Sequence, residues 1–164
     1  MNRENFIHML NEKVKLIRNE NGYTQNRMAE IIGISKKTLV EIEKERSSLG
    51  WTASVAVCSI FKESEILQFT FGGDTQDIIF SLTFDNCESK GGKTLGGKIW
   101  WKELDNSGLF SIQQNLISKH YRILDLKDNR ISYSFDYDYI IKRYGELNGK
   151  QNRMLYNTWL WGES

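Results

Sequence analysis

A group of mostly polar residues stands just after Ser35, at the start of a short segment with helical spacing. Serine is a preferred helix N-cap residue, so the exposed residues that follow it would point outward together. The residues in this group are Lys36, Lys37, Thr38, Val40 and Glu41. A lysine donates hydrogen bonds and a glutamate accepts them, so this group could recognise a binding partner through hydrogen bonds. The alternative is an ordinary solvated helix face.

No other set of residues indicates catalysis or metal binding. His120 is the single histidine of the C-terminal part, and no serine or cysteine nucleophile is recognisably paired with it. Cys58 and Cys87 show neither CxxC nor Cys/His ligand spacing. The glycine-rich stretch 91–97 does not have the spacing of a phosphate loop, and we expect a turn there. We therefore expect no catalytic site, no metal, no cofactor and no enzymatic activity.

Two adjacent tryptophans form the most conspicuous aromatic feature. Trp100 and Trp101 could stack a ligand or anchor a dimer, because tryptophan combines a large apolar face with a polar N–H. In the alternative, one of them is a core residue and its neighbour is partly exposed. The pair is thus a candidate dimer or ligand surface.

Length and charge limit the class of protein. The chain has 164 residues, enough for one ordinary domain or two small ones. Its 22 Lys and Arg nearly balance its 21 Asp and Glu, so the whole-chain charge does not predict a polyanionic partner. No apolar run approaches the roughly 20 residues of a membrane span, and no signal-peptide core opens the chain. We expect a soluble cytoplasmic protein with no membrane partner.

Five short helices are predicted in the first third of the chain. Apolar residues recur at helical spacing over residues 5–21, which predicts the first helix. Thr24 offers a hydroxyl N-cap to the second helix, which Gly33 stops after barely two turns. Ser35 caps the third helix, over residues 36 to about 44.

The fourth and fifth helices follow a polar link. Thr52 can cap the fourth helix, and the fifth begins near Ser64. Helices this short are not stable alone, so all five must share one core.

The pattern changes after residue 71, and sixteen of the 20 aromatic residues lie after residue 63. Alternating apolar residues over 78–84 favour a strand, and so does the alternation over 110–114. Residues 121–124 and 131–135 flank a Lys-Asp-Asn turn, which predicts a β-hairpin.

The C-terminal segment is predicted to begin as a helix. Asp136 is placed to cap that helix, and the closing segment 153–161 could be either helix or strand.

An ordered set of positions runs through the second and third helices: Thr24-Gln25-(x)3-Ala29-(x)3-Gly33-Ile34-Ser35-(x)3-Leu39-(x)2-Ile42-Glu43. Together with its flanks, from residue 6 to about 61, it resembles the phage-repressor helix-turn-helix family, also called Xre or Cro-like. Each position also has a physical reason. Ala29 is small because the two helices cross closely there, and Gly33 forms the tight turn that sets their angle.

The resemblance implies a role for the outward face of the third helix. Lys36, Lys37 and Glu41 match the family positions that enter the DNA major groove, and Thr38 and Val40 lie beside them. A lysine can donate to guanine, and a glutamate can accept from cytosine, so a site containing G·C pairs is expected.

The resemblance also implies contacts to the DNA backbone. Gln25, at the start of the second helix, resembles the phosphate-contacting glutamine of the family. Helix N-terminus polarity and positive charge could add further phosphate contacts at Thr24, Asn26, Lys44 and Arg46.

One position departs from the family pattern. The family commonly has glycine two positions after the residue matched by Glu43, and Glu45 stands there in this chain. Together with Glu41 and Glu43, its carboxylate would repel phosphates. Residues 1–63 carry only ten Lys and Arg against eight acidic residues. We therefore expect DNA binding that needs two domains acting together.

These observations predict an α+β protein. A five-helix helix-turn-helix domain over residues 1–66 would precede a small aromatic-rich antiparallel-sheet domain with one or two helices over residues 74–164. The first domain would bind double-stranded DNA, and the second would form a homodimer, bind a small-molecule or protein effector, or both. The function expected is a sequence-specific transcriptional regulator, such as a repressor, on a palindromic operator.

A second hypothesis belongs to another class. The chain could be a protein-binding module, such as an antitoxin or a phage-type inhibitor, that uses its helix-turn-helix for autoregulation.

Overall fold

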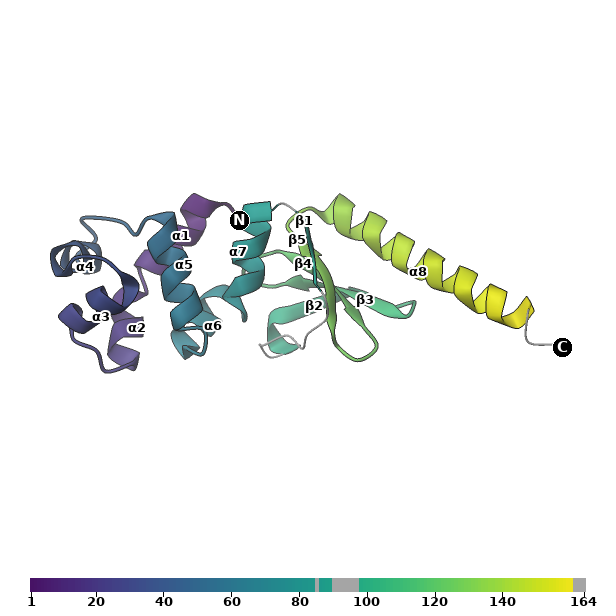
Figure 1. Ribbon diagram of the computed structural model, residues 1–164, viewed down its shortest axis with the longest axis horizontal. Helices are drawn as coiled ribbons and strands as arrows, with labels where there is room; N and C mark the ends of the chain where they lie inside the picture. The colour runs from purple at the N-terminus through teal and green to yellow at the C-terminus, as the bar shows by residue number, and fades with distance from the viewer. Residues whose placement is uncertain (85, 90–97, 161–164) are drawn as a thin grey trace.

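The computed structural model describes residues 1–84, 86–89 and 98–160. In these residues, seven helices are followed by a five-stranded antiparallel sheet and a long C-terminal helix (Figure 1). The predicted α+β class is confirmed. The glycine-rich stretch 91–97, expected to form a turn, lies outside the described residues.

The first seven helices are short, and they are α1 (Arg3–Asn11), α2 (Val14–Glu20), α3 (Gln25–Ile32), α4 (Lys36–Glu43), α5 (Trp51–Ile60), α6 (Glu65–Phe71) and α7 (Thr75–Phe84). Hydroxyl caps begin three of them: those of Thr24 and Ser35 were predicted, and Ser64 caps the helix that was expected to begin near it. Thr24, Ser35 and Ser64 each accept a hydrogen bond from the backbone N–H three residues later. These caps satisfy N–H groups that the first helical turn leaves unpaired.

Two helix boundaries in this region differ from the prediction. The helix expected over residues 5–21 is divided, because the N–H of Lys13 bonds to the carbonyl of Leu10, three residues back, and the α-helical ladder is interrupted. The Asn11 side chain at this break hydrogen-bonds to Ser48 and to the N–H of Leu49. Thr52 is not a cap, because α5 already starts at Trp51.

The strand predicted over residues 78–84 is wrong, because this segment is helix α7. Asp74 accepts a hydrogen bond from the N–H of Gln76 and stabilises the start of the helix. Ile78 and its neighbour Ile79 are buried in the helical core, whereas Phe80 and Phe84 stack on each other outside it. Apolar residues on several sides of one helix imitate the alternation of a strand.

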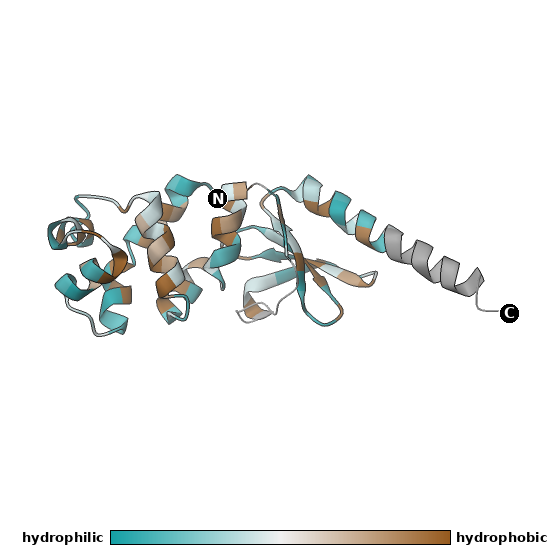
Figure 2. Cartoon of the chain, in the orientation of Figure 1, coloured by the Kyte–Doolittle hydropathy of each residue, from teal (hydrophilic) through white to brown (hydrophobic). Residues whose placement is uncertain are grey.

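All seven helices contribute to one apolar core, which extends from Phe6 to Ile79. At its centre the ring of Phe6 lies 4.7 Å from the ring of Phe71, between centroids. Helices α5 and α7 are rich in apolar residues, which are coloured brown in Figure 2. The core thus continues past α6 into the helix that adjoins the sheet.

The sheet has the strand order β1-β5-β4-β3-β2, and every neighbouring pair is antiparallel. Its strands are β1 (Asn86–Glu88), β2 (Trp101–Asp105), β3 (Phe110–Asn115), β4 (Tyr121–Asp125) and β5 (Arg130–Ser134). The strand predicted over residues 110–114 and the hairpin that joins β4 to β5 are confirmed. In the hairpin turn, Asp125 accepts hydrogen bonds from the N–H groups of Lys127 and Asn129.

Helix α8 (Tyr137–Leu160) covers one face of the sheet. Asp136 caps it as predicted, by accepting hydrogen bonds from two backbone N–H groups. Ile140 and Tyr144 pack on apolar side chains of β3 and β4, and residues 153–160 continue as helix beyond the sheet (Figure 1). None of the helices in the described ranges, α8 included, is long and apolar enough to cross a membrane.

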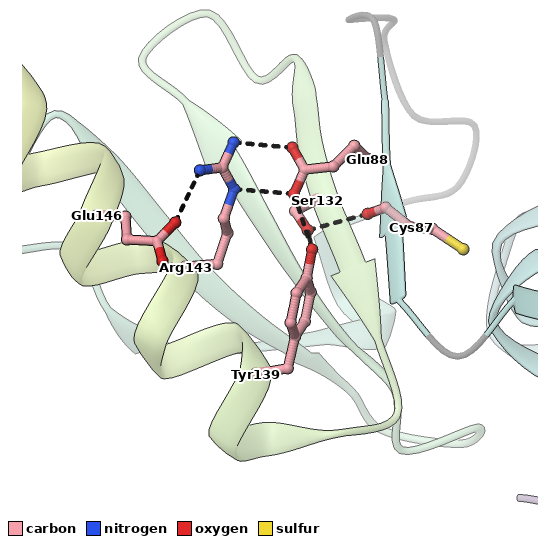
Figure 3. Close-up of polar contacts among 6 residues, drawn as sticks. All are labelled: Cys87, Glu88, Ser132, Tyr139, Arg143 and Glu146. Carbon is pink, nitrogen blue, oxygen red and sulfur yellow. Dashed lines mark hydrogen bonds and ion pairs between the residues drawn. The ribbon is translucent and has the colours of Figure 1, made fainter.

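A polar cluster fastens α8 to the short edge strand β1 (Figure 3). The guanidinium of Arg143 donates to both carboxylate oxygens of Glu88, at 2.8 and 3.0 Å, and to Glu146 at 3.1 Å. The hydroxyl of Tyr139 donates to the same Glu88 carboxylate at 2.8 Å. A bidentate pair has a defined planar geometry, so this contact ties α8 to β1 beside the apolar packing of Ile140 and Tyr144.

Helices α6 and α7 lie against the opposite side of the sheet (Figure 1). Buried polar contacts connect these helices to the sheet, and we call this contact region the joint. The carboxylate of Asp77, on α7, forms an ion pair with Arg130, on β5. The side-chain amide of Asn115 donates to the carbonyl of Gly72 at 2.8 Å. Gly72 has a φ of +74°, and an added Cβ would lie 2.7 Å from Oδ1 of Asn115.

Replacing Gly72 with alanine is therefore expected to lower the free energy of unfolding by about 2–4 kcal/mol, from the left-handed backbone and the contact with Asn115 together. Gly22→Ala is the matched control. Gly22 also has a positive φ, +66°, but nothing lies within 4 Å of an added Cβ. Its cost should be about 1 kcal/mol, from the backbone alone. Urea unfolding of both variants measures the difference, and equal costs would show that the joint does not depend on this close contact.

Candidate nucleic-acid interface

Helices α3 and α4 pack together across a tight turn. Gly33 lies in the left-handed region, with a φ of +75°, and the N–H of Ile34 bonds back to the carbonyl of Ala29 at 3.0 Å. Ala29 is buried between the helices. The small residue and the glycine thus have the structural roles that the sequence predicted.

The first turn of α4 presents its polar side chains to solvent. Lys36, Lys37 and Thr38 are exposed, while Leu39 and Ile42 are buried in the core. The cap fixes this turn, because the Ser35 hydroxyl oxygen accepts from the N–H of Thr38 at 3.0 Å. The hydroxyl of Thr38 lies 2.7 Å from that of Ser35, so it already has a partner inside the cap.

The remaining two residues of the predicted base-contacting set are less exposed. Val40 and Glu41 are half-buried on the side of α4. Base contacts by any of the five residues stay a prediction.

The residues predicted to contact phosphates lie at two helix ends. Thr24 and Asn26 stand at the start of α3, and Lys44 and Arg46 follow α4; all four are exposed. Two of these side chains have intramolecular partners. Thr24 caps α3, and the amide of Asn26 donates to Glu30 at 2.8 Å.

Gln25 is half-buried, and its amide nitrogen donates to the Glu43 carboxylate at 2.8 Å. An amide has two N–H donors, so one remains for an external acceptor. In the free protein, Gln25 therefore links α3 to the end of α4.

Glu43 belongs to a buried ion pair that sequence reasoning missed. Arg18, on α2, donates to its two oxygens at 2.5 and 3.1 Å, and a third N–H of Arg18 donates to the carbonyl of Tyr23 at 2.9 Å. The Glu43 side chain is only 4% exposed. Burial by itself raises the pKa of Glu43, but hydrogen bonds from Arg18 and Gln25 outweigh it and hold the pKa below its ordinary value.

This pair corrects the expected row of three phosphate-repelling glutamates. Glu43 points inward, and the positive charge of Arg18 balances its negative charge. The two residues are 25 positions apart, on helices whose packing brings them together, so local spacing holds no signal for the contact. The carboxylates that remain near this surface are the half-buried Glu41 and the exposed Glu45.

Glu45 occupies a backbone conformation that favours glycine. Its φ is +59°, in the left-handed region, and its N–H bonds to the carbonyl of Ile42 at 2.9 Å. This turn closes α4. The glycine of the family pattern thus has a conformational reason, and the glutamate keeps the same turn at a cost of about 1 kcal/mol.

The two tryptophans both have partners within the chain. The ring of Trp100 lies 5.6 Å from Phe69, on α6, between centroids. The ring of Trp101 lies 5.0 Å from His120, and the guanidinium carbon of Arg122 lies 3.6 Å from its centroid. Both tryptophans are half-buried. A role for them in dimer or ligand binding stays a prediction.

His120 does have a serine partner, contrary to the reading of the sequence. The Ser118 hydroxyl lies 2.6 Å from Nδ1 of His120, and both residues are buried. Burial, followed by the charge of Arg122, lowers the pKa of His120 to about 3, so its ring is neutral near pH 7. Within the described ranges, no group of three His, Cys, Asp or Glu residues could hold a metal ion.

Comparison with known proteins agrees with the helical geometry. Residues 11–59 match a family described as a helix-turn-helix domain, a span that runs from the end of α1 into α5. Neither the curated proteins nor the solved structures contain a match to the chain. The N-terminal third of this protein carries a helix-turn-helix domain of the Xre/Cro-like type, the kind of domain found in DNA-binding regulators.

Proposed function

We propose that this protein is a sequence-specific transcriptional regulator that reads DNA with the first turn of α4. The observation that carries the proposal is the exposure of Lys36, Lys37 and Thr38 on a capped helix whose other face is fixed in the core. A rigid helix with outward polar side chains at its N-terminal end suits the major groove.

The charges around α4 favour this role. Because Arg18 balances Glu43 in the interior, that carboxylate does not offset the lysines at the surface. No carboxylate of the described residues lies within 4.0 Å of either Lys36 or Lys37. Both ammonium groups can donate to guanine, and the half-buried Glu41 can accept from cytosine N4.

Contacts to the DNA backbone would position this turn. Thr24, Gln25 and Asn26 surround the N-terminus of α3, where free N–H groups and the helix dipole favour a phosphate. Lys44 and Arg46 follow α4 and supply positive charge. Such contacts set the register on DNA and carry no sequence information themselves.

We assign DNA reading to residues 1–66 and pairing of two chains to residues 74–164. A homodimer would present two recognition helices to a palindromic operator, about 34 Å apart. The free end of α8 supports this assignment, since it extends past the sheet on the side away from the helix-turn-helix (Figure 1). The C-terminal part would also be the place for an effector.

The double variant Lys36→Ala/Lys37→Ala tests the base-reading role. Genomic fragments selected by the wild-type protein at fixed salt should share a motif, and the variant should bind that motif about 100-fold more weakly. Lys102→Ala/Lys127→Ala is the matched control, since both lysines are exposed on the sheet part of the chain. The control should keep both motif and affinity. A motif unchanged by the loss of Lys36 and Lys37 would contradict the proposal.

Glu45→Gly should raise both stability and DNA affinity. Glycine adopts the positive φ without strain, so the free energy of unfolding should rise by about 0.5–1 kcal/mol. Loss of the carboxylate should raise DNA affinity several-fold at low salt. Glu45→Gln separates the two effects, because it removes the charge and keeps the strain. If Glu45→Gln gains as much stability as Glu45→Gly, backbone conformation is not the cause.

The spacing of the half-sites tests the dimer. Once the operator is known, inserting 5 base pairs at its centre turns one half-site by about half a turn of DNA. Affinity should fall at least tenfold, and inserting 10 base pairs should restore much of it. Equal affinity for all three operators, measured with the full chain, would show that each chain binds alone.

A further inference from the structure

A buried polar cluster lies between the sheet and the helices that precede it. Ile112 and Ile123 pair across β3 and β4 and face α8, so the next pair, Gln113 with Arg122, faces the other way. Asn115 shares that face, and it bonds to Gly72 at the end of α6. The cluster therefore occupies the joint between the helix-turn-helix and the sheet.

Arg122 carries a buried positive charge: burial lowers its pKa to about 10, and the negative charge of Asp128 only partly opposes this shift. Arg122 is 3% exposed, and its Nε and Nη2 both donate to the single oxygen Oε1 of Gln113, at 2.9 and 2.7 Å. Its Nη1 has no hydrogen-bond partner. In the described part of the chain, no carboxylate lies within 4.0 Å of the guanidinium. Buried charges in proteins are normally paired.

Two neighbouring side chains also have unpaired nitrogens. His120 is 1% exposed, and its Nδ1 contacts the Ser118 hydroxyl, but its Nε2 has no partner. Nε1 of Trp101 is buried and also unpaired. If Ser118 donates to Nδ1, then Nε2 carries the proton, and all three unpaired nitrogens are donors.

The three side chains are adjacent, because the Trp101 ring contacts both of the others. The His120 ring lies 5.0 Å from it between centroids, and the Arg122 guanidinium carbon lies 3.6 Å from its centroid. Buried N–H groups without an acceptor are rare, so the unpaired N–H groups of Arg122 and Trp101, joined by Nε2 of His120 in that tautomer, indicate a missing acceptor. The charge of Arg122 indicates that this acceptor is negative.

We propose that Arg122, His120 and Trp101 bind a small singly charged anion, either a carboxylate group or an inorganic ion of similar size. The ion would accept from Nη1 of Arg122, Nε2 of His120 and Nε1 of Trp101. One negative charge balances the guanidinium, whereas a dianion would leave a buried excess charge.

The neighbours of this site connect it to the helix-turn-helix. Trp100 contacts Phe69 on α6, and Phe135, which packs on the helical core, lies 5.7 Å from the His120 ring. An occupied site would therefore hold the joint in one arrangement. A change in DNA affinity rests on the proposed function, but anion binding does not.

The test uses the full chain without DNA, titrated with sodium formate and separately with sodium chloride, by calorimetry and by thermal unfolding. Trp101→Phe removes the indole N–H donor but keeps an aromatic ring at this position, so the affinity for the anion should fall about tenfold. Arg122→Gln should abolish binding. Trp100→Phe is the matched control, because it changes the adjacent ring outside the site and should bind as the wild type does. Circular dichroism checks that each variant is folded.

Saturable binding of formate but not chloride identifies the carboxylate of an organic effector, and equal binding of both identifies a site for inorganic monoanions. Either result supports the proposal. It is overturned if the folded wild-type chain shows no saturable response to either salt, or if Trp101→Phe and Trp100→Phe respond equally. A second titration with DNA present separates the two claims. If the chain binds the anion saturably but selects no DNA motif, the anion site is supported and the proposed function as a regulator is contradicted.

Discussion

The shared apolar core is the constraint on which the rest of the structure depends. The seven helices before the sheet have only seven to ten residues each, and helices of that length do not persist alone in water. Each helix therefore holds its position because its neighbours do. The exposed turn of α4 is rigid for the same reason, since Leu39 and Ile42 fix its other face in the core.

The sequence could predict those features of the fold that depend on neighbouring residues, such as helix caps and tight turns. Thr24 and Ser35 cap their helices through contacts three residues away, and Gly33 needs only its own backbone conformation, so a short window contains the whole interaction. Helix α7 was mistaken for a strand because Ile78 and Phe80 are both apolar but have different surroundings, one in the core and one outside it. Only the packing of distant elements distinguishes these surroundings.

The polar contacts around the candidate site could not be predicted from the sequence, because they also depend on the packing of distant elements. Arg18 and Glu43 meet because α2 and α4 pack on a common core, and nothing in the residues between them specifies the pair. The same holds for Arg122 and Trp101, which lie on strands separated by β3. In both cases an arginine contacts a buried partner: a carboxylate for Arg18, and an amide oxygen and an aromatic face for Arg122.

Helix α7 belongs to both parts of the chain. Ile78 and Ile79 complete the helical core, while Asp77 on the same helix pairs with Arg130 of the sheet. The Gly-Gly-Asp segment before α7 looks like a natural place to divide the gene, but a cut there would remove apolar side chains from the helix-turn-helix and leave a hole in its core. A chimera that joins this DNA-binding part to a foreign sensor should therefore take α7 along and replace Asp77, whose carboxylate would otherwise be buried without its arginine.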